Sequence, residues 1–474
     1  MDGLLHVVGR NAPAGRHLPI DYFFRSLAAT RKSWAIGVIL SGTASDGTVG
    51  LEAIKAEGGI TFAQEPESAK YDGMPRNAIA AGCVDFVLPP ERIALELARI
   101  AKHPFVAVPL REEGETLVGK EEDWARLLRL LRTASGVDFT FYKKSTIRRR
   151  VARRMALHKL ESIGEYLKLL EQHHAEIDIL FREILIPVTG FFRDPEVFVA
   201  LKETVLPRII EANRPGSPIR IWVPGCSSGE EAYSIAMCLL EYLGDRASTT
   251  TIQIFGTDIN EVAIEKARAG VYSGIEMSDV SPERRLRFFT RANGNYSVNP
   301  GLREPCIFAR PDLTKDPPFS KLDLISCRNV LIYLESVLRR RVLSLFHYAL
   351  RDSGMLMLGR SESLGTFADL FTATDRRNKF FTRNVTARVP IALAEAPQAA
   401  AAPSGKAATE AVPHLDLERE ADRIVWERYA HSGIVVNSAL QFSALSRRHQ
   451  PIPATGSGQS QPGSVTNAAR RAST

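Results

Sequence analysis

Two separate stretches of the chain alternate short apolar runs with helical patterns, and this alternation constrains the fold more than any other feature. The first stretch lies within residues 1–105 and the second within residues 219–385 of a chain of 474 residues. Strands that alternate with helices form parallel sheets, because the chain must cross back over the sheet before the next strand. The sequence therefore predicts the α/β fold class, with two units and room for about three domains.

The first unit contains three predicted strands, which are separated by helices. The strands cover 35–40, 60–63 and 84–88, and the helices cover 48–57, 75–81 and 91–101. Gly58 and Gly59 end the first of these helices. A parallel sheet needs cover on both faces. Three strands therefore predict only part of a domain.

A basic helical segment follows a charged, glycine-containing linker over 106–122. Ile147, Val151 and Met155 recur every four residues and predict one apolar stripe on a helix. Residues 143–159 contain eight Lys or Arg and no acidic residue. Three interpretations stay open for this charge: a solvated helix face, a nucleic-acid surface, or a docking surface for an acidic protein helix.

The second unit has the pattern of a doubly wound sheet. Its predicted strands cover 219–223, 252–256, 322–326 and 355–358, with helices over 230–243, 262–269 and 337–350. Small residues follow the first strand at 224–229, where a ligand can approach the backbone and the N-terminus of the next helix. Asp258 ends the second strand, where a carboxylate can accept hydrogen bonds from both hydroxyls of a ribose. This indicates an adenosine-type cofactor, although many such loops are only structural.

The first loop lacks two other nucleotide-binding patterns. It is neither G-x-G-x-x-G, which disfavours NAD, nor the phosphate loop G-x-x-x-x-G-K-[ST].

Charge and cysteine usage exclude several classes of protein. Lys plus Arg minus Asp plus Glu is 61 − 54 = +7, too small a surplus to indicate nucleic acid by itself. The five cysteines form no C-x-x-C pair, so we interpret them as reduced thiols of a cytoplasmic protein, and we expect no metal site. No apolar run has the length of a signal peptide or of a membrane span, so we expect no membrane insertion.

Four ordered motifs in the second half of the chain resemble one enzyme family. They are P-V-T-G-F-F-R-D at 187–194, G-E-E-A-Y at 229–233, T-D-I at 257–259 and C-R-N-V-L-I-Y at 327–333. With their spacing they resemble the chemoreceptor glutamate methyltransferase family, CheR, over about 122–385. The resemblance implies an N-terminal helical domain, a doubly wound methyltransferase sheet and a small β insertion over 272–310. The implied cofactor is S-adenosylmethionine, and the implied partner is the cytoplasmic domain of a chemoreceptor.

The resemblance also implies roles for individual residues. Those that match cofactor contacts are Thr189, Arg193, Glu231, Asp258, Asp312, Leu313, Arg328 and Asn329. Tyr333 matches the tyrosine beside the reactive methyl group, and Arg150, Arg153 and Arg154 match the basic positions that face the receptor. Two residues depart from the family pattern: Pro187 and Asp312 each replace an asparagine. Pro187 lacks a side-chain donor, whereas Asp312 can still accept a hydrogen bond from an adenine amino group.

Elementary chemistry is consistent with this assignment. A glutamate side chain is already ionised at pH 7, so its methylation needs no general base. Alignment of two reactants can contribute on the order of 7–11 kcal/mol. We expect Arg193 and Arg328 to supply charge, one by a forked contact with the cofactor carboxylate and the other by orienting the site. We predict that Arg193 and Tyr333 act in catalysis, the alternative being that they only stabilise the fold.

The first unit resembles part of another family. S-G-T-A-S-D-G at 41–47, Q-E-P-E-S-A at 64–69 and M-P-R-N-A at 74–78 resemble the C-terminal half of the receptor methylesterase domain, CheB. That family uses a Ser/His/Asp triad, and Asp46 matches its aspartate. No G-x-S-x-G occurs before residue 35, and His6 and His17 lie in no matching motif. We therefore predict no methylesterase activity, and a role for Asp46 as a helix N-cap.

The predicted organisation is a partial methylesterase domain (1–105), a linker (106–122), a helical domain (123–190), a methyltransferase domain (191–385), a flexible linker (386–414), a helical fragment (415–441) and a disordered tail (442–474). The predicted function is S-adenosylmethionine-dependent methylation of receptor glutamates in chemotaxis-type signalling, with no nucleic-acid partner. The alternatives are a non-catalytic signalling scaffold that retains cofactor and receptor binding, and a nucleic-acid methyltransferase that uses the basic helix.

Overall fold

The computed structural model describes residues 18–103, 120–185, 189–214, 216–274, 276–292, 294–387, 434–436 and 442–445. His6, His17 and Pro187 lie outside these residues, as do most of both predicted linkers and the predicted helix over 415–428. The chain divides into two units, residues 1–396 and 397–474.

The smaller unit, residues 397–474, differs from the prediction made for it. Strands β14 (Ile434–Val436) and β15 (Phe442–Leu445) pair antiparallel, where the sequence predicted a helical fragment and the start of a disordered tail. The β-branched run of β14 favours a strand over a helix.

A three-stranded parallel sheet forms the first part of the larger unit, as predicted. Its strands are β1 (Ile36–Ile39), β2 (Ile60–Gln64) and β3 (Phe86–Leu88), in the order β1-β2-β3. Its helices are α1 (Pro19–Arg31), α2 (Thr48–Ala56), α3 (Gly73–Ala80) and α4 (Pro90–Ile100). Helix α1, which packs against α2, was not among the predicted elements.

A helix from the next segment completes the cover of this sheet. Ala152 and Ala156 of α7 (Lys144–Leu157) are buried in one apolar cluster with Ile60 and Phe62 of β2. The cover that a parallel sheet requires on both faces is therefore supplied in part from outside the first segment. Small side chains at 152 and 156 allow the helix to approach the sheet closely.

Four helices make up the helical segment: α6 (Glu121–Ser135), α7, α8 (Ile163–Gln172) and α9 (His174–Leu185). The predicted stripe of Ile147, Val151 and Met155 is buried in their shared core. Ser162 and Glu165 form a capping box at the start of α8. The 3.6-residue period of the sequence thus located the apolar face of α7 correctly.

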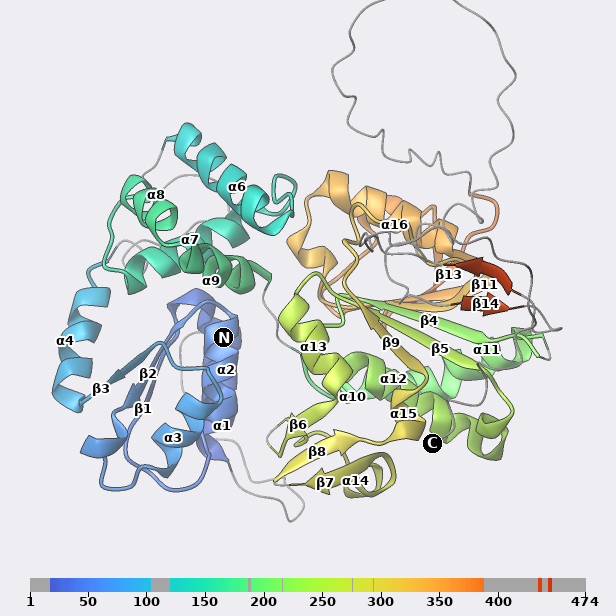
Figure 1. The fold of residues 1–474 in the computed structure, drawn as a ribbon, viewed down its shortest axis with the longest axis horizontal. Coiled ribbons are helices and arrows are strands. Elements are labelled where there is room, and N and C mark those ends of the chain that lie inside the picture. Colours follow the sequence, from blue (N-terminus) through green and yellow to red (C-terminus); the bar gives the residue numbers. More distant parts are fainter. Residues whose placement is uncertain are drawn as a thin grey trace, which may run out of the picture. The chain divides into compact units, whose positions relative to one another are not determined.

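A seven-stranded sheet forms the third part, with helices on both faces (Figure 1). The strand order is β12-β13-β11-β10-β4-β5-β9, and β13 runs antiparallel to both of its neighbours, β11 and β12. The strands are β4 (Ile219–Pro224), β5 (Ile252–Thr257), β9 (Cys306–Ala309), β10 (Leu322–Cys327), β11 (Leu350–Leu358), β12 (Phe371–Asp375) and β13 (Phe380–Arg383). The helices are α10 (Pro195–Ala200), α11 (Leu206–Ala212), α12 (Glu230–Leu243), α13 (Glu261–Ala269) and α16 (Ser336–Ala349), with short turns η3 (Leu201–Val205) and η5 (Leu331–Tyr333).

Side chains alternate between the two faces of this sheet, as a strand requires. In β4, Ile221 and Val223 belong to the core shared with α12, whereas Trp222 lies in the core shared with α16. The chain runs from β4 to β5 on one side and later to β10 on the other side of β4. Ligands of doubly wound sheets bind at such a switch point, outside the carboxyl ends of the strands.

A small antiparallel sheet is inserted before β9, in agreement with the predicted β insertion. It contains β6 (Val271–Ser273), β7 (Phe289–Ala292) and β8 (Asn295–Val298) in the order β6-β8-β7, together with α14 (Pro282–Phe288) and α15 (Pro300–Arg303). Within the described part of the chain, none of the helices has the length and apolar character needed to cross a bilayer.

Candidate active site

A cavity of about 1250 Å³ opens where β4, β5 and β10 end. Its lining includes every predicted cofactor contact and the predicted catalytic tyrosine: Thr189, Arg193, Glu231, Asp258, Asp312, Leu313, Arg328, Asn329 and Tyr333. These residues come from five separate places in the chain. They meet because the carboxyl ends of parallel strands lie at one edge of a sheet.

The loop after β4 brings the backbone close to this cavity. Gly225 has a φ of +71°, and a Cβ atom there would collide with the side chain of Val330. Gly229 has a φ of +94° and precedes the first turn of α12. Both positions thus require glycine. Among the described residues, the buried hydroxyl of Ser227 finds no hydrogen-bond partner.

Asp258 lies directly beside this loop. Its Oδ2 accepts a hydrogen bond from the backbone N–H of Ser227 at 2.9 Å, and its Oδ1 accepts one from the N–H of Asn260 at 2.8 Å. Burial raises the pKa of Asp258 above its ordinary value, and backbone donors oppose the rise. A carboxylate has about four acceptor positions. The carboxylate therefore keeps acceptor capacity for donors that enter the cavity.

Arg328 holds the site together by ion pairs. Its guanidinium is buried and contacts the Asp194 carboxylate at 2.6 Å and the Glu231 carboxylate at 3.4 Å. It also donates to the carbonyl of Arg193 at 2.8 Å. Burial raises the pKa of Glu231, while the charge of Arg328 opposes this effect. Arg328 thus contacts Asp194, Glu231 and Arg193 beside the cavity, and the exposed Arg193 side chain lines it. The roles expected of the two arginines stay predictions.

Asp312 starts a turn at another part of the cavity wall. Its Oδ1 accepts hydrogen bonds from the N–H and the hydroxyl of Thr314, at 2.8 and 2.6 Å. These contacts leave the Oδ2 atom of Asp312 with acceptor capacity, apart from the Lys315 ammonium at 3.6 Å.

Tyr333 is tied to the helical segment. Its carbonyl accepts a hydrogen bond from the N–H of Lys143 at 2.9 Å, and Tyr142 forms a β-bridge with Leu334. Burial raises the pKa of Tyr333, so its phenol stays neutral at pH 7. The connection between α6 and α7 thus forms one wall of the cavity beside this tyrosine.

These residues fit the cofactor implied by the sequence resemblance. Asp258 offers acceptors to a ribose diol, the glycine-containing loop allows close approach of a nucleoside, and Ser227 offers an unpartnered hydroxyl. Arg193 can meet an amino-acid carboxylate. Chemistry of the donors and volume of the cavity are therefore compatible with S-adenosylmethionine.

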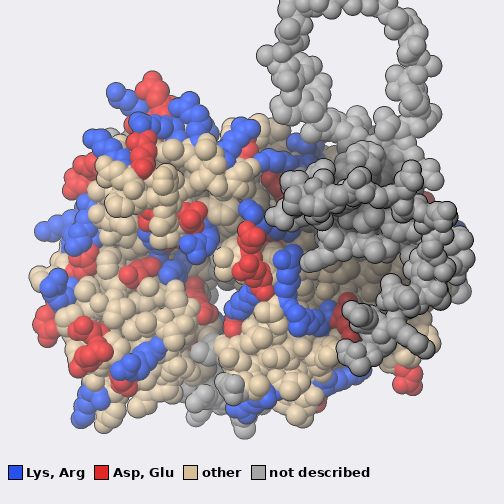
Figure 2. Space-filling model, in the orientation of Figure 1, with Lys and Arg blue, Asp and Glu red and all other residues tan. Residues whose placement is uncertain are grey.

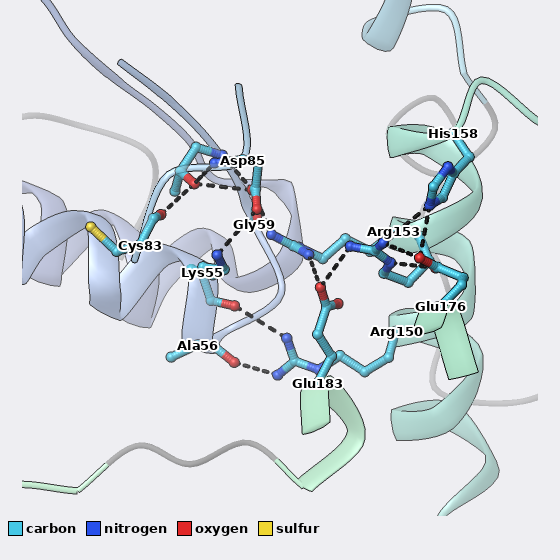
Figure 3. A network of polar contacts seen from close by, with 12 residues as sticks. Lys55, Ala56, Gly59, Cys83, Asp85, Arg150, Arg153, His158, Glu176 and Glu183 are labelled. Carbon is cyan, nitrogen blue, oxygen red and sulfur yellow. Dashed lines mark hydrogen bonds and ion pairs between the residues drawn. The ribbon is translucent and has the colours of Figure 1, made fainter. Parts of the chain in front are cut away.

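The predicted docking residues are not an exposed surface in this structure, which corrects that expectation. Arg150 and Arg153 are 6 % and 0 % exposed, and Arg154 is largely buried. Figure 3 shows the Arg150 and Arg153 side chains reaching the first segment, where they meet the Ala56 and Gly59 carbonyls and the Asp85 carboxylate. The physical reason is that the three-stranded sheet β1-β2-β3 has an uncovered face. Helix α7 packs against this face, and Arg150 and Arg153 are buried between the two segments.

Arg154 makes its contacts within the helical segment. Its guanidinium bonds both oxygens of Glu176, and it lies 3.2 Å from Glu183, which Arg153 also contacts. For Arg150, burial lowers the pKa to about 10, which leaves it charged at pH 7. Docking by these three residues stays a prediction.

Asp46 caps a helix other than the one it precedes. Its two carboxylate oxygens accept hydrogen bonds from the N–H groups of Ile20 and Asp21, in the first turn of α1. The sequence predicted capping, but the N-cap residue of α2, which follows Asp46, is Gly47, and the carboxylate that accepts from the first turn of α2 is that of Asp21, from the N–H of Gly50 at 2.7 Å.

Several residues of the site were missed by the sequence analysis. Asp194 pairs with Arg328, and Glu362 contacts the loop after β10. Tyr142 and Ser227 line the cavity, and the hydroxyl of Ser227 has no partner among the described residues. The signal available for Glu362 was its position just after a predicted strand, where the other site residues also lie.

The surface charge gives no support to a nucleic-acid surface on the face that Figure 2 shows. Lys and Arg side chains are interspersed there with Asp and Glu over the described residues. The buried arginines of α7 are not available to phosphates in this arrangement.

Comparisons with known families divide the chain into three matched regions. Residues 187–380 match the CheR methyltransferase SAM binding domain, 122–185 match the CheR methyltransferase all-alpha domain, and 5–97 match the CheB methylesterase. The chain thus joins a CheB region to both CheR domains, and its methyltransferase domain is of the type that binds S-adenosylmethionine.

Two relatives show how much of each protein is shared. A chemotaxis protein methyltransferase of Listeria monocytogenes is 33% identical over 261 residues, which are 55% of this chain and 97% of that protein. An uncharacterized 104.1 kDa protein of Rhodobacter capsulatus is 39% identical over 394 residues, 78% of this chain. The chain covers 41% of the length of that larger relative.

Solved structures match smaller parts. The Thermotoga maritima CheB methylesterase catalytic domain is 38% identical over 16% of this chain and 41% of its own, with a TM-score of 0.16. A SAM-dependent methyltransferase from Geobacter sulfurreducens in complex with S-adenosyl-L-homocysteine is 14% identical over 36% of this chain and 48% of its own, with a TM-score of 0.20.

Proposed function

Because the chain belongs to the CheR family of chemotaxis protein methyltransferases, we propose that it methylates glutamate side chains of chemoreceptors. The observation that carries this proposal is the convergence of Arg193, Asp258, Asn329 and Tyr333 on one cavity. Bound there, S-adenosylmethionine supplies a methyl group whose bond to sulfur breaks as a carboxylate oxygen forms the new bond, which leaves a methyl ester and S-adenosylhomocysteine.

The chain's own residues need only bind, orient and exclude water. The incoming glutamate is already a carboxylate at pH 7, so no side chain has to remove a proton. The buried Arg328 supports this role by fixing Arg193 and Glu231 around the cavity. Alignment in such a site is the main source of rate acceleration that the geometry can supply.

We assign separate roles to the cavity residues. Asp258 would bind the ribose hydroxyls, Asp312 and Leu313 would contact the adenine, and Arg193 would hold the cofactor carboxylate. Tyr333 would pack beside the methyl group. Thr189 and Asn329 complete the wall of the same cavity.

We further propose that the first segment has no methylesterase activity. Both oxygens of Asp46 are engaged with the start of α1. Neither histidine of the sequence before residue 35 lies in a triad-like motif.

The test of the proposed function is transfer of labelled methyl groups to purified cytoplasmic fragments of candidate chemoreceptors, beside calorimetry with S-adenosylhomocysteine. Base-labile methyl incorporation that is lost when the receptor glutamates are replaced by alanine is the expected result. Binding without incorporation into any receptor fragment would favour the non-catalytic scaffold. A folded protein that binds no S-adenosylhomocysteine would contradict the proposal.

A further inference from the structure

A buried carboxylate lies behind the loop that follows β10. Glu362 is 3 % exposed, and its Oε1 accepts hydrogen bonds from the backbone N–H groups of Val330 and Leu331, at 2.9 and 2.8 Å. Its Oε2 accepts from the N–H groups of Asn329 and Gly359, at 3.0 and 2.6 Å. One side chain thus satisfies three successive N–H groups of a loop that lies more than 30 residues earlier in the chain.

The loop needs such an acceptor because of its conformation. Asn329 has a φ of +60°, in the left-handed region that non-glycine residues rarely adopt. The N–H groups of residues 329–331 precede or open the short turn η5, so the turn itself cannot satisfy them. Buried donors without a partner are costly. The Glu362 carboxylate therefore stabilises a backbone shape that would otherwise be unfavourable.

The close approach of two chain segments makes this contact possible. Strands β10 and β11 are parallel neighbours, with Cys327 opposite Leu358, so the loops that follow them leave the sheet side by side. A Cβ atom on Gly359 would lie 2.8 Å from Glu362 Oε2 and 3.0 Å from the Asn329 nitrogen. A side chain at 359 would thus disturb the contact.

The residues carried by this loop are those that face the cavity. Arg328 directly precedes it and pairs with Asp194 and Glu231, and Asn329 and Tyr333 line the cavity. Ser361 also lines the cavity, whereas Glu362 is not among its lining residues. A change at Glu362 would therefore reach bound molecules only through the loop.

We propose that Glu362 is a positioning residue of the methyltransferase site, whose carboxylate holds residues 329–331 so that Asn329 and Tyr333 face the cofactor. The assignment of the reaction rests on the proposed function, but the effect on the loop does not. The role belongs to one residue outside the motifs that carry the family resemblance.

The decisive comparison is Glu362→Gln against Asp323→Asn. Asp323 is a matched control, because it is also a buried carboxylate, lies near the start of β10 and accepts hydrogen bonds from the N–H of Arg220 and the side chain of Arg351 at 2.8 Å each. The amide that Glu362→Gln introduces would turn an N–H group toward N–H donors. Both variants are expected to lower the midpoint of thermal unfolding. A purely structural role of either carboxylate predicts the same loss, so the midpoint does not distinguish the two roles.

Loop geometry and ligand binding separate the two roles. Amide hydrogen exchange of residues 329–331 should accelerate at least tenfold in Glu362→Gln and stay within about twofold of wild type in Asp323→Asn. The Kd of S-adenosylhomocysteine should rise at least tenfold in Glu362→Gln alone, with a fall in kcat for methyl transfer. Unchanged exchange in the loop, or an equal loss of binding in Asp323→Asn, would overturn the proposal.

A second variant covers the case in which Glu362→Gln does not fold. Gly359→Ala places a methyl group against the same contact and should also accelerate exchange at residues 329–331. The two claims can fail separately. Fast exchange of residues 329–331 in the wild-type chain would refute the positioning role, and a wild-type chain that binds no S-adenosylhomocysteine would refute the proposed function. Slow exchange in Gly359→Ala and wild type alike would refute the positioning role.

Discussion

The guanidinium of Arg153 lies 2.5 Å from the carboxylate of Asp85, and both side chains are almost fully buried. The two residues are 68 positions apart and belong to different matched regions, the CheR all-alpha domain and the CheB methylesterase. Burial by itself would raise the pKa of Asp85, but Arg153 and Lys55 outweigh it and lower the pKa below its ordinary value. The carboxylate is therefore ionised and paired at neutral pH.

Removal of one partner of this buried pair should destabilise the chain strongly. Arg153→Leu leaves the buried Asp85 charge with Lys55 as its one ion-pair partner among the described residues, and the expected loss is about 3–5 kcal/mol in the free energy of unfolding. Urea denaturation monitored by circular dichroism measures it. Asp72→Asn is the control, because its pair with Arg76 is exposed and screened by solvent, so its loss should have a much smaller effect on the free energy of unfolding. Equal effects of the two substitutions would show that the buried pair contributes nothing special.

The contact of Arg154 with Glu176 predicts a dependence of stability on pH. Burial would raise the pKa of Glu176, but hydrogen bonds from His158 and Arg154 lower it to about 2 from an ordinary value of 4.5. A depressed pKa contributes stability above the unfolded value, and that stability is lost as pH falls toward the folded value. The difference in unfolding free energy between wild type and Glu176→Gln should shrink from pH 5 toward pH 3. A difference that stays constant or grows over this range would contradict the assignment.

Asp258→Ala should weaken cofactor binding. Hydrogen bonds to a charged group contribute about 1.5–3 kcal/mol, which corresponds to a roughly 10–100-fold rise in the Kd of S-adenosylhomocysteine. Isothermal titration calorimetry measures this change. Asp279→Ala removes an exposed carboxylate of the β insertion and should leave the Kd unaltered. Wild-type affinity in Asp258→Ala would exclude the proposed ribose contact.

Arg193→Ala should lower kcat/KM for methyl transfer by roughly 10–100-fold, on the same scale for a charge-assisted hydrogen bond. The exposed side chain of Arg193 suggests that the fold itself will be little affected. The assay is labelled-methyl incorporation into a receptor fragment at several cofactor concentrations. Arg377→Ala, in the exposed turn between β12 and β13, is the control. Equal rates for both variants would show that the Arg193 side chain has no role in methyl transfer.

The capping role of Asp46 predicts a structural effect without a catalytic one. Loss of an N-terminal cap costs about 0.5–2 kcal/mol, so Asp46→Ala should destabilise the first segment and accelerate amide exchange in α1. Thr43→Ala, an exposed neighbour in the same loop, should not. Neither the wild-type chain nor these variants should release methanol from a methylated receptor fragment, and clear turnover by the wild type would refute the predicted absence of esterase activity.

The sequence determined most of the architecture, because the responsible signals are local. Alternation of strands and helices predicted both sheets, and the period of Ile147, Val151 and Met155 located the core face of α7. The family resemblance implied that Asp258 and Arg328 contact one cofactor, and both line one cavity, where the carboxyl ends of parallel strands lie at one edge. Helix α1 was not among the predicted elements.

Only the tertiary structure decided which surfaces are covered and which side chains support others. The charge run of α7 looks the same in sequence whether it faces water or a neighbouring sheet, and packing of Ala152 and Ala156 against β2 selected the sheet. Glu362 meets Asn329 across 33 residues, and Asp46 meets Asp21 across 25. Such contacts depend on how distant segments pack, which no local period or spacing can report.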